Sequence, residues 1–578
     1  MSKLLGWVFD KVMSRPLSRF REAVKRPFAS QEEALRRILR ENADTEFGKR
    51  HGFAKMAGKP GTELWRDFRR DVPIRGYADF LPEIERMKNG EANVLIPGRP
   101  EMFSLTSGTT SEPKFCPVNR TFIKEHHRQH LLWMYNVYND HPRVNEGKYL
   151  VVASPSEMGR TGGGIPFGAM SGKQLDVQSI PVRRRMAAPA LIQHLPEAED
   201  RWFNFLLFAL AEENLRVVTS VNPSTLVSMA NRMNRDAERL IEHLAKGHPD
   251  ADRREACPAA RQLGQAFRPI PERAKRLGEI YRAEGQLRPA AAWPGLEMLL
   301  TWQGGSSSFY LPHVAALWGR TPQRCLGLRA SEGTFTIPLR DHTASAVLAV
   351  GGHVMEFIPE SQGDPKPGTP TLLAGQLEKD GLYRLVVTTS GGFYRYDMGD
   401  LVRVTGFNQR TPEVAFERRA GAVLSATGEK LTEDQVVGAM EVAAASGPLM
   451  NGFTLTWEME DGVVRYVLAF ECTGGDEVVR TRGKLLGERV RQLLAVFDDE
   501  LMSRNCEYQA KRDDGRIAFP RAVLLAEGSY ERMRARLAGE GKPENQIKQR
   551  VLAAPPGPGR FPVTGCPFFD NMPIIAEI

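Results

Sequence analysis

The stretch from Ser104 to Lys114 reads SLTSGTTSEPK, and it decides how the rest of the chain is interpreted. Six hydroxyl side chains lie around Gly108 within eight residues, and Lys114 follows Pro113 directly. Glycine permits backbone angles that turn several N–H groups toward one point, where hydroxyl groups and a lysine can join them in holding phosphate oxygens. We therefore predict a phosphate-binding loop, and the alternative is a surface turn rich in serine and threonine. The order differs from GxxxxGK[ST], which disfavours an ordinary P-loop NTPase.

The length and composition predict a soluble globular protein with more than one domain. A single core rarely grows beyond about 250–300 residues, and this chain has 578. Hydrophobic residues make up 42% and charged residues 26%, values that argue against a disordered or fibrous chain. Apolar runs such as 203–210 are far shorter than the roughly 20 residues needed to span a bilayer. The N-terminal segment is expected to form an amphipathic helix, which either packs on the protein or touches a membrane surface.

Charge and cysteine content argue against nucleic acid as a partner and favour a cytoplasmic location. The 78 basic and 70 acidic residues leave a net charge of +8, without a long basic tract. The six cysteines are scattered and form no CxxC pair, which predicts reduced thiols and neither a disulfide framework nor a thiol-based metal site. The N-terminus is too charged and its apolar stretch too short for a signal peptide.

Helical and strand-like segments alternate along the chain, which predicts an α/β architecture. Strands are expected at 148–153, 216–221, 344–350, 382–389 and 401–405, and helices at 201–213 and 227–246. The pattern restarts after 419–421 with a hairpin at 423–431, a helix at 432–445 that begins with a capping box of Thr432 and Gln435, strands across 453–470 and a helix at 478–494. We therefore expect one domain over residues 1–419 and another over residues 420–578.

The loop resembles the phosphate loop of the adenylate-forming superfamily of acyl-CoA synthetases, luciferases and peptide-synthetase adenylation domains. It is most similar to the branch of plant auxin-responsive acyl-acid amido synthetases, although Ser111 stands where a glycine is usual. The resemblance extends over nearly the whole chain, at 42–48, 71–73 with Tyr77, 82–86, 293–294 and 304–310. It implies a large N-terminal domain of β-sheets flanked by helices and a smaller, mobile α+β C-terminal domain.

A second motif, LRASE at 328–332, implies further nucleotide contacts by resemblance. Ala330 and Ser331 would lie in the nucleotide pocket, and Glu332 would bind Mg²⁺, a hard cation that prefers oxygen ligands. The alternative for Glu332 is an exposed surface carboxylate. The plant enzymes tend to have a tyrosine near the position of Leu328, so an aromatic contact with the nucleotide is absent here or supplied from elsewhere.

The third motif, YRYDMGD at 394–400, is similar to the family's YRYRxGD element. By this resemblance, Tyr394 would contact the nucleotide and Asp400 would accept hydrogen bonds from the two ribose hydroxyls, because a carboxylate offers two acceptor oxygens. The alternative is that Gly399 and Asp400 form a simple hairpin turn. Asp397 stands where the family pattern has its second arginine, which puts that contact in doubt.

The resemblance also assigns roles near the domain boundary and in the C-terminal domain. Arg419 and Lys430 would contact the nucleotide, with an ordinary charged linker and turn as the alternative. Lys548 lies in an Asn-Gln-Ile-Lys element and would neutralise charge on the α-phosphate together with Lys114, the loop N–H groups and the Mg²⁺ ion bound by Glu332. A late lysine in a basic segment is otherwise simply solvated. The implied nucleotide contacts in the phosphate loop are Thr106, Ser107, Gly108, Thr109 and Thr110.

The acyl substrate is expected to bind near the helix that follows the loop. By resemblance, its pocket includes His127, Arg128 and Leu131, together with Gly164 and Ile165 of a glycine-rich turn. Arg128 either pairs with a second polar group of the acid or is a surface residue.

The implied function is that of an ATP-dependent acyl-acid amido synthetase that uses Mg²⁺. A small carboxylic acid would react with ATP to give an acyl-adenylate and pyrophosphate, and an amino acid or another amine would then take the acyl group and release AMP. One alternative is transfer of the acyl group to a thiol, either CoA or a separate carrier protein. Another is a nucleotide-binding scaffold without activity.

Overall fold

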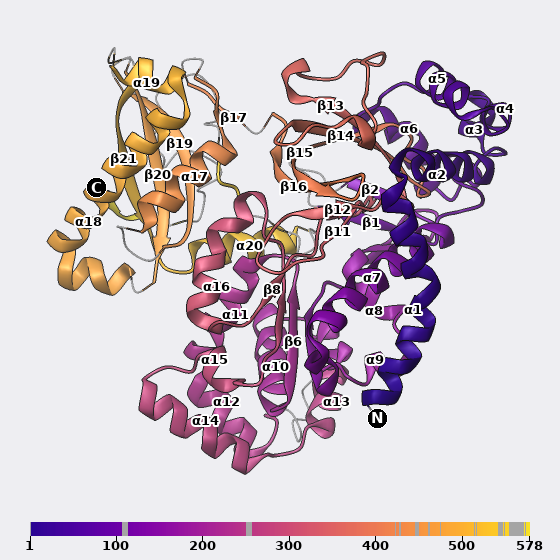
Figure 1. Cartoon of the computed structure of the whole chain (residues 1–578). Helices are drawn as coiled ribbons and strands as arrows, with labels where there is room; N and C mark the ends of the chain where they lie inside the picture. Colours follow the sequence, from indigo (N-terminus) through magenta and orange to yellow (C-terminus); the bar gives the residue numbers. More distant parts are fainter. Residues whose placement is uncertain are drawn as a thin grey trace. The chain divides into compact units, whose positions relative to one another are not determined.

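The computed structural model describes residues 2–106, 114–249, 257–421, 423–426, 429–445, 450–460, 463–473, 475–513, 515, 517–540, 547, 549–553, 572 and 574–577. The chain forms two compact units, an N-terminal unit over Met1–Phe416 and a C-terminal unit over Glu417–Ile578 (Figure 1). The boundary expected from the sequence, after residue 419, lies close to this division.

The N-terminal unit contains a parallel sheet, a mixed sheet, a larger antiparallel sheet and a short β-hairpin. The parallel sheet has the order β3-β6-β7-β8, and a mixed sheet has the order β2-β1-β5-β4. A six-stranded antiparallel sheet has the order β11-β12-β16-β15-β14-β13, and β9 pairs with β10 alone. The strands are β1 Met102–Thr106, β2 Lys114–Val118, β3 Lys148–Val152, β4 Gly159–Arg160, β5 Pro166–Gly168, β6 Leu215–Ser220, β7 Met298–Leu300, β8 Gln323–Arg324, β9 Arg329–Ala330, β10 Gly333–Thr334, β11 Thr336–Ile337, β12 Ala346–Leu348, β13 Val354–Pro359, β14 Leu382–Thr388, β15 Tyr396–Asn408 and β16 Thr411–Arg419.

Helices surround these sheets, and α7 carries much of the packing near the predicted site. It begins at Asn119, whose side chain accepts a hydrogen bond from the Phe122 N–H and so caps the first turn. The helix α1 runs along α7 (Figure 1). The helices are α1 Ser2–Lys25, α2 Pro27–Glu41, α3 Glu46–Arg50, α4 Phe53–Ala57, α5 Gly61–Asp71, α6 Tyr77–Lys88, α7 Arg120–Asp140, α8 Met170–Asp176, α9 Ile180–Arg183, α10 Ala198–Ala211, α11 Pro223–Arg235, α12 Ala237–Lys246, α13 Pro258–Ala266, α14 Pro271–Glu284, α15 Pro289–Ala292 and α16 Leu311–Trp318.

The C-terminal unit is an α+β unit built on the sheet β19-β20-β21-β22. Its strands are β17 Val423–Leu424, β18 Leu431–Thr432, β19 Met450–Glu460, β20 Val463–Cys472, β21 Ile517–Leu525 and β22 Ile574–Glu577. Its helices are α17 Glu433–Ala444, α18 Gly475–Arg504, α19 Cys506–Asp513 and α20 Ser529–Gly539. The predicted capping box is confirmed, because the Thr432 N–H donates to Gln435 Oε1 at 3.1 Å.

Most predicted elements are present, but one predicted helix was wrong. The segment 227–246 forms two helices, α11 and α12, that meet at Asp236. The Asp236 N–H donates the last hydrogen bond of α11, to the Arg232 carbonyl. Asp236 itself has φ −96° and ψ 13°, which lie outside the helical region, so the helix is interrupted there. The predicted strand at 401–405 is the middle of the longer β15, which begins at Tyr396. Within the described residues, no helix has the length and apolar character needed to cross a membrane.

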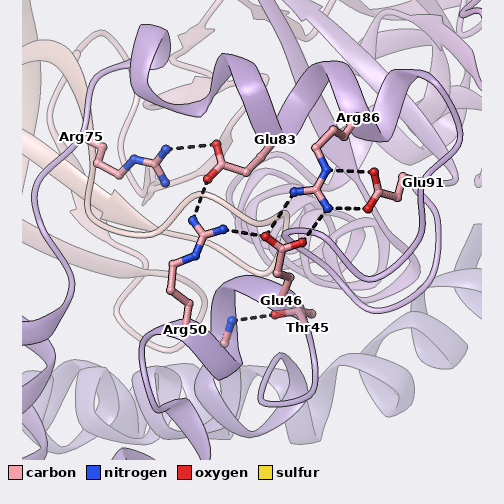
Figure 2. Close-up of polar contacts among 8 residues, drawn as sticks. Thr45, Glu46, Arg50, Arg75, Glu83, Arg86 and Glu91 are labelled. Atoms are coloured by element: carbon pink, nitrogen blue, oxygen red, sulfur yellow. Dashed lines mark hydrogen bonds and ion pairs between the residues drawn. The ribbon is translucent and has the colours of Figure 1, made fainter.

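An ion-pair network joins α3 to α6 (Figure 2). Arg86 donates to both oxygens of Glu46, at 3.1 and 2.5 Å, and Arg50 donates to Glu46 at 2.6 Å. Glu83 accepts from Arg50 at 3.4 Å and from Arg75 at 3.1 Å. These residues belong to the stretches 42–48 and 82–86 that carry the family resemblance, or lie beside them. Their contacts are made within the fold, so this part of the resemblance reflects how the helices before the phosphate loop are held together.

Candidate functional site

The two ends of the predicted phosphate loop lie side by side. Strands β1 and β2 pair antiparallel, with Thr106 directly opposite Lys114. The described residues that flank segment 107–113 therefore lie next to each other at one end of the β1–β2 pair. The predicted nucleotide contacts Ser107, Gly108, Thr109 and Thr110 lie outside the described residues.

The second motif lies against the same end of β1. Ala330 pairs with Gly333 across the β9–β10 hairpin, so Ser331 and Glu332 form its turn. The Ser331 hydroxyl donates to the Leu105 carbonyl at 3.0 Å, one residue before Thr106. Glu332 is only 5% exposed, so it is not the solvated surface carboxylate that the alternative interpretation required. The fold thus brings together two motifs that are more than 200 residues apart in the sequence.

Tyr77 completes this cluster from helix α6. The Lys114 ammonium lies 5.2 Å from the centre of the Tyr77 ring, and the Tyr77 hydroxyl accepts the Phe115 N–H at 2.6 Å. Burial raises the pKa of both Tyr77 and Cys116, and the charge of Glu332 raises both further. Glu332 is therefore within electrostatic reach of strand β2. In the sequence, Tyr77 lies in the stretch before the phosphate loop that carries the family resemblance, and this was the available signal that it belongs to the site.

The third motif mainly supports the fold. Tyr394 is fully buried, stacks on Phe47 with ring centres 4.7 Å apart, and donates its hydroxyl to the Leu95 carbonyl at 2.6 Å. Arg395, at φ 47°, donates to Glu356 at 2.9 Å in a buried ion pair. The Tyr394 side chain is therefore enclosed by the core, and a contact of this residue with the nucleotide stays a prediction.

The departure from the family pattern at Asp397 also has a structural reason. Asp397 accepts two hydrogen bonds from Arg384, at 2.8 and 2.7 Å, and a third from the Gly399 N–H at 2.9 Å. Gly399 has φ 69°, a left-handed conformation that glycine adopts without strain, and lies where the pairing of β14 with β15 shifts register. Asp400 lies within the same irregularity and is 5% exposed. The register shift of β15 thus includes the predicted ribose contact.

The predicted acyl-site residues lie in different surroundings. The His127 ring is 3.1 Å from Gln174 of α8, and Arg128 donates to the Gly351 carbonyl at 3.5 Å. Leu131 packs on the hydrophobic cluster that contains Trp133, Val137 and Leu300. Ile165 belongs to another cluster, with Phe103 and Cys116, and Gly164 precedes it at φ 77°. The hydrophobic contacts therefore do not place Ile165 beside Leu131.

Sequence reasoning missed a group of histidines on the inner face of α7. His126 and His130 lie one turn apart, and His126 Nδ1 is 3.0 Å from the Thr334 hydroxyl of the β9–β10 hairpin. Burial lowers the pKa of His126 to about 3 and the pKa of His130 well below its usual value. Both rings are thus neutral near pH 7. His126 and His130 are four residues apart, and this helical spacing was the available signal that they share one face of the helix.

Arg419 and Lys430, the predicted contacts near the domain boundary, lie in the C-terminal unit. Arg419 is the last residue of β16. Lys430 is exposed, has φ 51°, and its N–H donates to the Ser425 hydroxyl at 3.4 Å. Lys548 lies outside the described residues. Where the structure describes the chain, no three His, Cys, Asp or Glu side chains gather as a metal site would require.

Family models match three consecutive parts of the chain. The GH3 family N-terminal domain matches residues 16–323, the central domain matches residues 346–419, and the C-terminal domain matches residues 434–556. The chain belongs to the GH3 family. The end of the central GH3 domain at residue 419 coincides with the end of β16.

Relatives of this GH3 chain include enzymes named as amido synthetases and amino acid synthetases. An indole-3-acetic acid-amido synthetase of Arabidopsis thaliana is 25% identical over 515 residues, which cover 84% of this chain and 89% of that protein. A jasmonoyl–L-amino acid synthetase of Nicotiana attenuata is 27% identical over 460 residues, covering 75% and 76% of the two chains. The similarity thus extends over most of both proteins in each case.

Solved structures confirm the predicted fold class. The GH3.15 acyl acid amido synthetase matches with a TM-score of 0.80 and 19% identity over 97% of this chain and 96% of that one. A 2-hydroxyisobutyryl-CoA ligase in its postadenylation state matches with a TM-score of 0.52 and 13% identity over 91% and 89%. The GH3 chain therefore has the adenylate-forming fold, with a large unit of sheets and helices and a smaller α+β unit.

Proposed function

We propose that this chain is an ATP-dependent acyl-acid amido synthetase. The observation that carries the proposal is the gathering of Thr106, Lys114, Ser331 and Glu332 at the ends of β1 and β2 in a member of the GH3 family. The relatives named above as amido synthetases support the same activity. The substrates would be a small carboxylic acid, ATP and an amino acid or another amine.

In the first half-reaction, a carboxylate oxygen of the acid attacks the α-phosphorus of ATP. The new bond is a carboxylic–phosphoric anhydride, the bond to the β-phosphate oxygen breaks, and pyrophosphate leaves. No protein nucleophile is required, so the protein contributes by positioning the reactants and neutralising charge. We assign that neutralisation to Lys114 and, from the resemblance, to Lys548.

The nucleotide would be held by groups on both sides of this cluster. The N–H and hydroxyl groups of 106–110 suit the phosphates, Ala330 and Ser331 the nucleotide pocket, and Asp400 the ribose hydroxyls. By the family resemblance, Arg419 and Lys430 would also contact the nucleotide. In the second half-reaction, the amine attacks the acyl carbonyl, the amide forms after loss of a proton, and AMP leaves.

Glu332 fits the role of a magnesium ligand. Magnesium is commonly bound by one or two carboxylates together with substrate phosphates and water, rather than by a cage of protein side chains. A single buried carboxylate next to the end of strand β1 matches that chemistry. When bound, the ion would neutralise phosphate charge, while Glu332 itself would hold it and Lys114 would act on the phosphates beside it.

Thioester formation is a second candidate, favoured by the structural match to a CoA ligase in its postadenylation state. Both candidates share the first half-reaction and differ in the nucleophile of the second. The acyl-adenylate can therefore be formed first without an acceptor, and separate portions can then be mixed with amino acids and with CoA in one experiment.

The test is pyrophosphate release by the full chain with ATP, Mg²⁺ and a panel of carboxylic acids. We expect release that requires both ATP and an acid, and a product with an amino acid whose mass equals that of the acid plus the amino acid minus water. A CoA thioester with no amide would favour the second candidate. A folded protein that binds ATP yet releases no pyrophosphate with any acid would contradict both.

A further inference from the structure

Arg329 begins the β9–β10 hairpin and lies against helix α7. Its Nη1 donates to Nδ1 of His130 at 3.3 Å, and its guanidinium carbon lies 4.6 Å from the centre of the Trp133 ring. Thr334, its partner across the hairpin, contacts His126 on the same face of α7. The guanidinium group is therefore fixed between the hairpin and the helix.

Among the described residues, no carboxylate shifts the pKa of this cation. Burial lowers the pKa of Arg329 to about 10, and the one group that raises this pKa is the thiol of Cys325. The nearby rings of His126 and His130 are neutral near pH 7. A buried charge without an opposite charge is costly, which indicates that a ligand supplies the missing charge.

A comparison with two other arginines shows which edge of the Arg329 guanidinium makes no hydrogen bond within the described residues. Nε and Nη2 of Arg384 bind the two oxygens of Asp397 at 2.8 and 2.7 Å, and Arg512 uses the same two atoms for Asp498 at 3.0 and 2.7 Å. In Arg329 these same atoms, Nε and Nη2, have no hydrogen-bond partner within the described part of the chain and are shielded from solvent. They form the side of the guanidinium fork that matches a carboxylate.

The position of Arg329 connects this edge to the acyl substrate. Arg329 directly precedes Ala330 and lies two residues before Ser331, whose hydroxyl binds the end of β1 beside the phosphate loop. An acid whose reacting carboxylate lies at the α-phosphate thus has its remaining atoms close to the hairpin. The sequence left Arg128 open between a contact with a second polar group of the acid and a surface position, and its side chain donates to the Gly351 carbonyl at 3.5 Å.

We infer that the acid activated by this chain carries a second carboxylate, or a similar planar oxyanion, which binds the Nε–Nη2 edge of Arg329. This inference rests on the proposed function, because it names the class of acid used at the same site. The second carboxylate takes no part in the reaction: its two oxygens accept hydrogen bonds from Arg329 while the first carboxylate reacts.

The test compares acids that differ only at the distal end. Matched pairs are straight-chain dicarboxylic acids against monocarboxylic acids of equal length, and terephthalic acid against 4-methylbenzoic acid, each assayed by ATP-dependent pyrophosphate release. In the wild type we expect kcat/KM for at least one diacid to exceed that for its matched monoacid by about 30-fold. This is the scale of the contribution of one hydrogen bond to a charged group. Arg329→Gln should abolish this preference through a higher KM for the diacid, with the monoacid little changed.

Arg120→Gln is the matched control, since it removes an exposed arginine of α7 that pairs with Glu101, and it should keep the preference. If Arg329→Gln does not fold, Arg329→Lys keeps the charge but lacks the fork and should reduce the preference in part. Monoacids used as well as diacids by the wild type would overturn the inference while leaving the proposed function intact. An equal loss for both acids in Arg329→Gln would also overturn it and indicate a structural role. Absence of pyrophosphate release with every acid would instead contradict the proposed function.

Discussion

The Ser331–Glu332 turn and the Tyr394–Asp397 segment both match motifs of one family, yet their side chains are used differently. The turn is anchored by a single hydroxyl to β1 and holds Glu332 at the end of the phosphate loop. In the other segment, Tyr394, Arg395 and Asp397 are each bound by partners within the fold. A match to a motif therefore does not separate residues that act on a substrate from residues that position them, whereas the contacts of each side chain do.

The largest expected effect is on stability, at the buried ion pair of the second segment. Arg395→Met should lower the free energy of unfolding of the N-terminal unit by about 3 kcal/mol or more, because it leaves Glu356 buried beside fewer donors. Tryptophan fluorescence during chemical denaturation reports on this unit, since seven of the eight tryptophans lie in it. A control, Arg384→Met, removes a pair nearer the surface and should cost less. Equal losses of unfolding free energy in Arg395→Met and Arg384→Met would contradict the greater structural importance of the buried pair.

Lys114→Ala should have the next largest effect, and it should be on catalysis. We expect kcat/KM for acid-dependent pyrophosphate release to fall about 100-fold or more, since charge neutralisation in a desolvated site contributes on this scale. The midpoint of thermal unfolding should change little, because this ammonium lies over the face of the Tyr77 ring and not in a buried ion pair among the described residues. Lys114→Arg should restore part of the rate. Loss of stability without loss of rate would place Lys114 with the structural residues.

The neutral histidines beneath the hairpin predict a dependence of stability on pH. The pKa of His126 is about 3 in the folded chain and that of an unfolded histidine is about 6.5, so between these values the unfolded chain binds more protons. Stability should therefore fall as the pH is lowered below about 6.5, by about 2 kcal/mol at pH 5 for this one group. His126→Gln should reduce that loss by the same amount in denaturation curves measured at pH 7.5 and pH 5. An unchanged difference would contradict the buried, neutral state of His126.

The smallest expected effect is that of Tyr394→Phe. The change removes one hydroxyl that donates to the Leu95 carbonyl, and it should cost about 1 kcal/mol in the free energy of unfolding. The KM for ATP should stay at the wild-type value, whereas Asp400→Asn should raise it. A higher KM for ATP in Tyr394→Phe would restore the nucleotide contact that the sequence suggested.

The sequence predicted elements whose signals are local and missed features that depend on distant partners. The strand at 148–153 and the capping box at Thr432 follow from alternation and spacing within a few residues, and both are present. The burial of Tyr394 against Phe47 joins residues more than 340 positions apart, which no local pattern encodes. The same holds for the contact of Arg329 with α7, because only the folded chain places the hairpin beside His130.

Acid-dependent exchange of pyrophosphate with ATP, measured in Glu332→Gln and Tyr394→Phe beside the wild type, tests the central claim most directly. The claim is that the hairpin turn acts in adenylation while the Tyr394 segment supports the fold. It predicts that Glu332→Gln loses most of its exchange and keeps its unfolding midpoint, and that Tyr394→Phe keeps its exchange and unfolds slightly earlier. Full exchange by Glu332→Gln at every Mg²⁺ concentration, together with loss of exchange in a folded Tyr394→Phe, would contradict it.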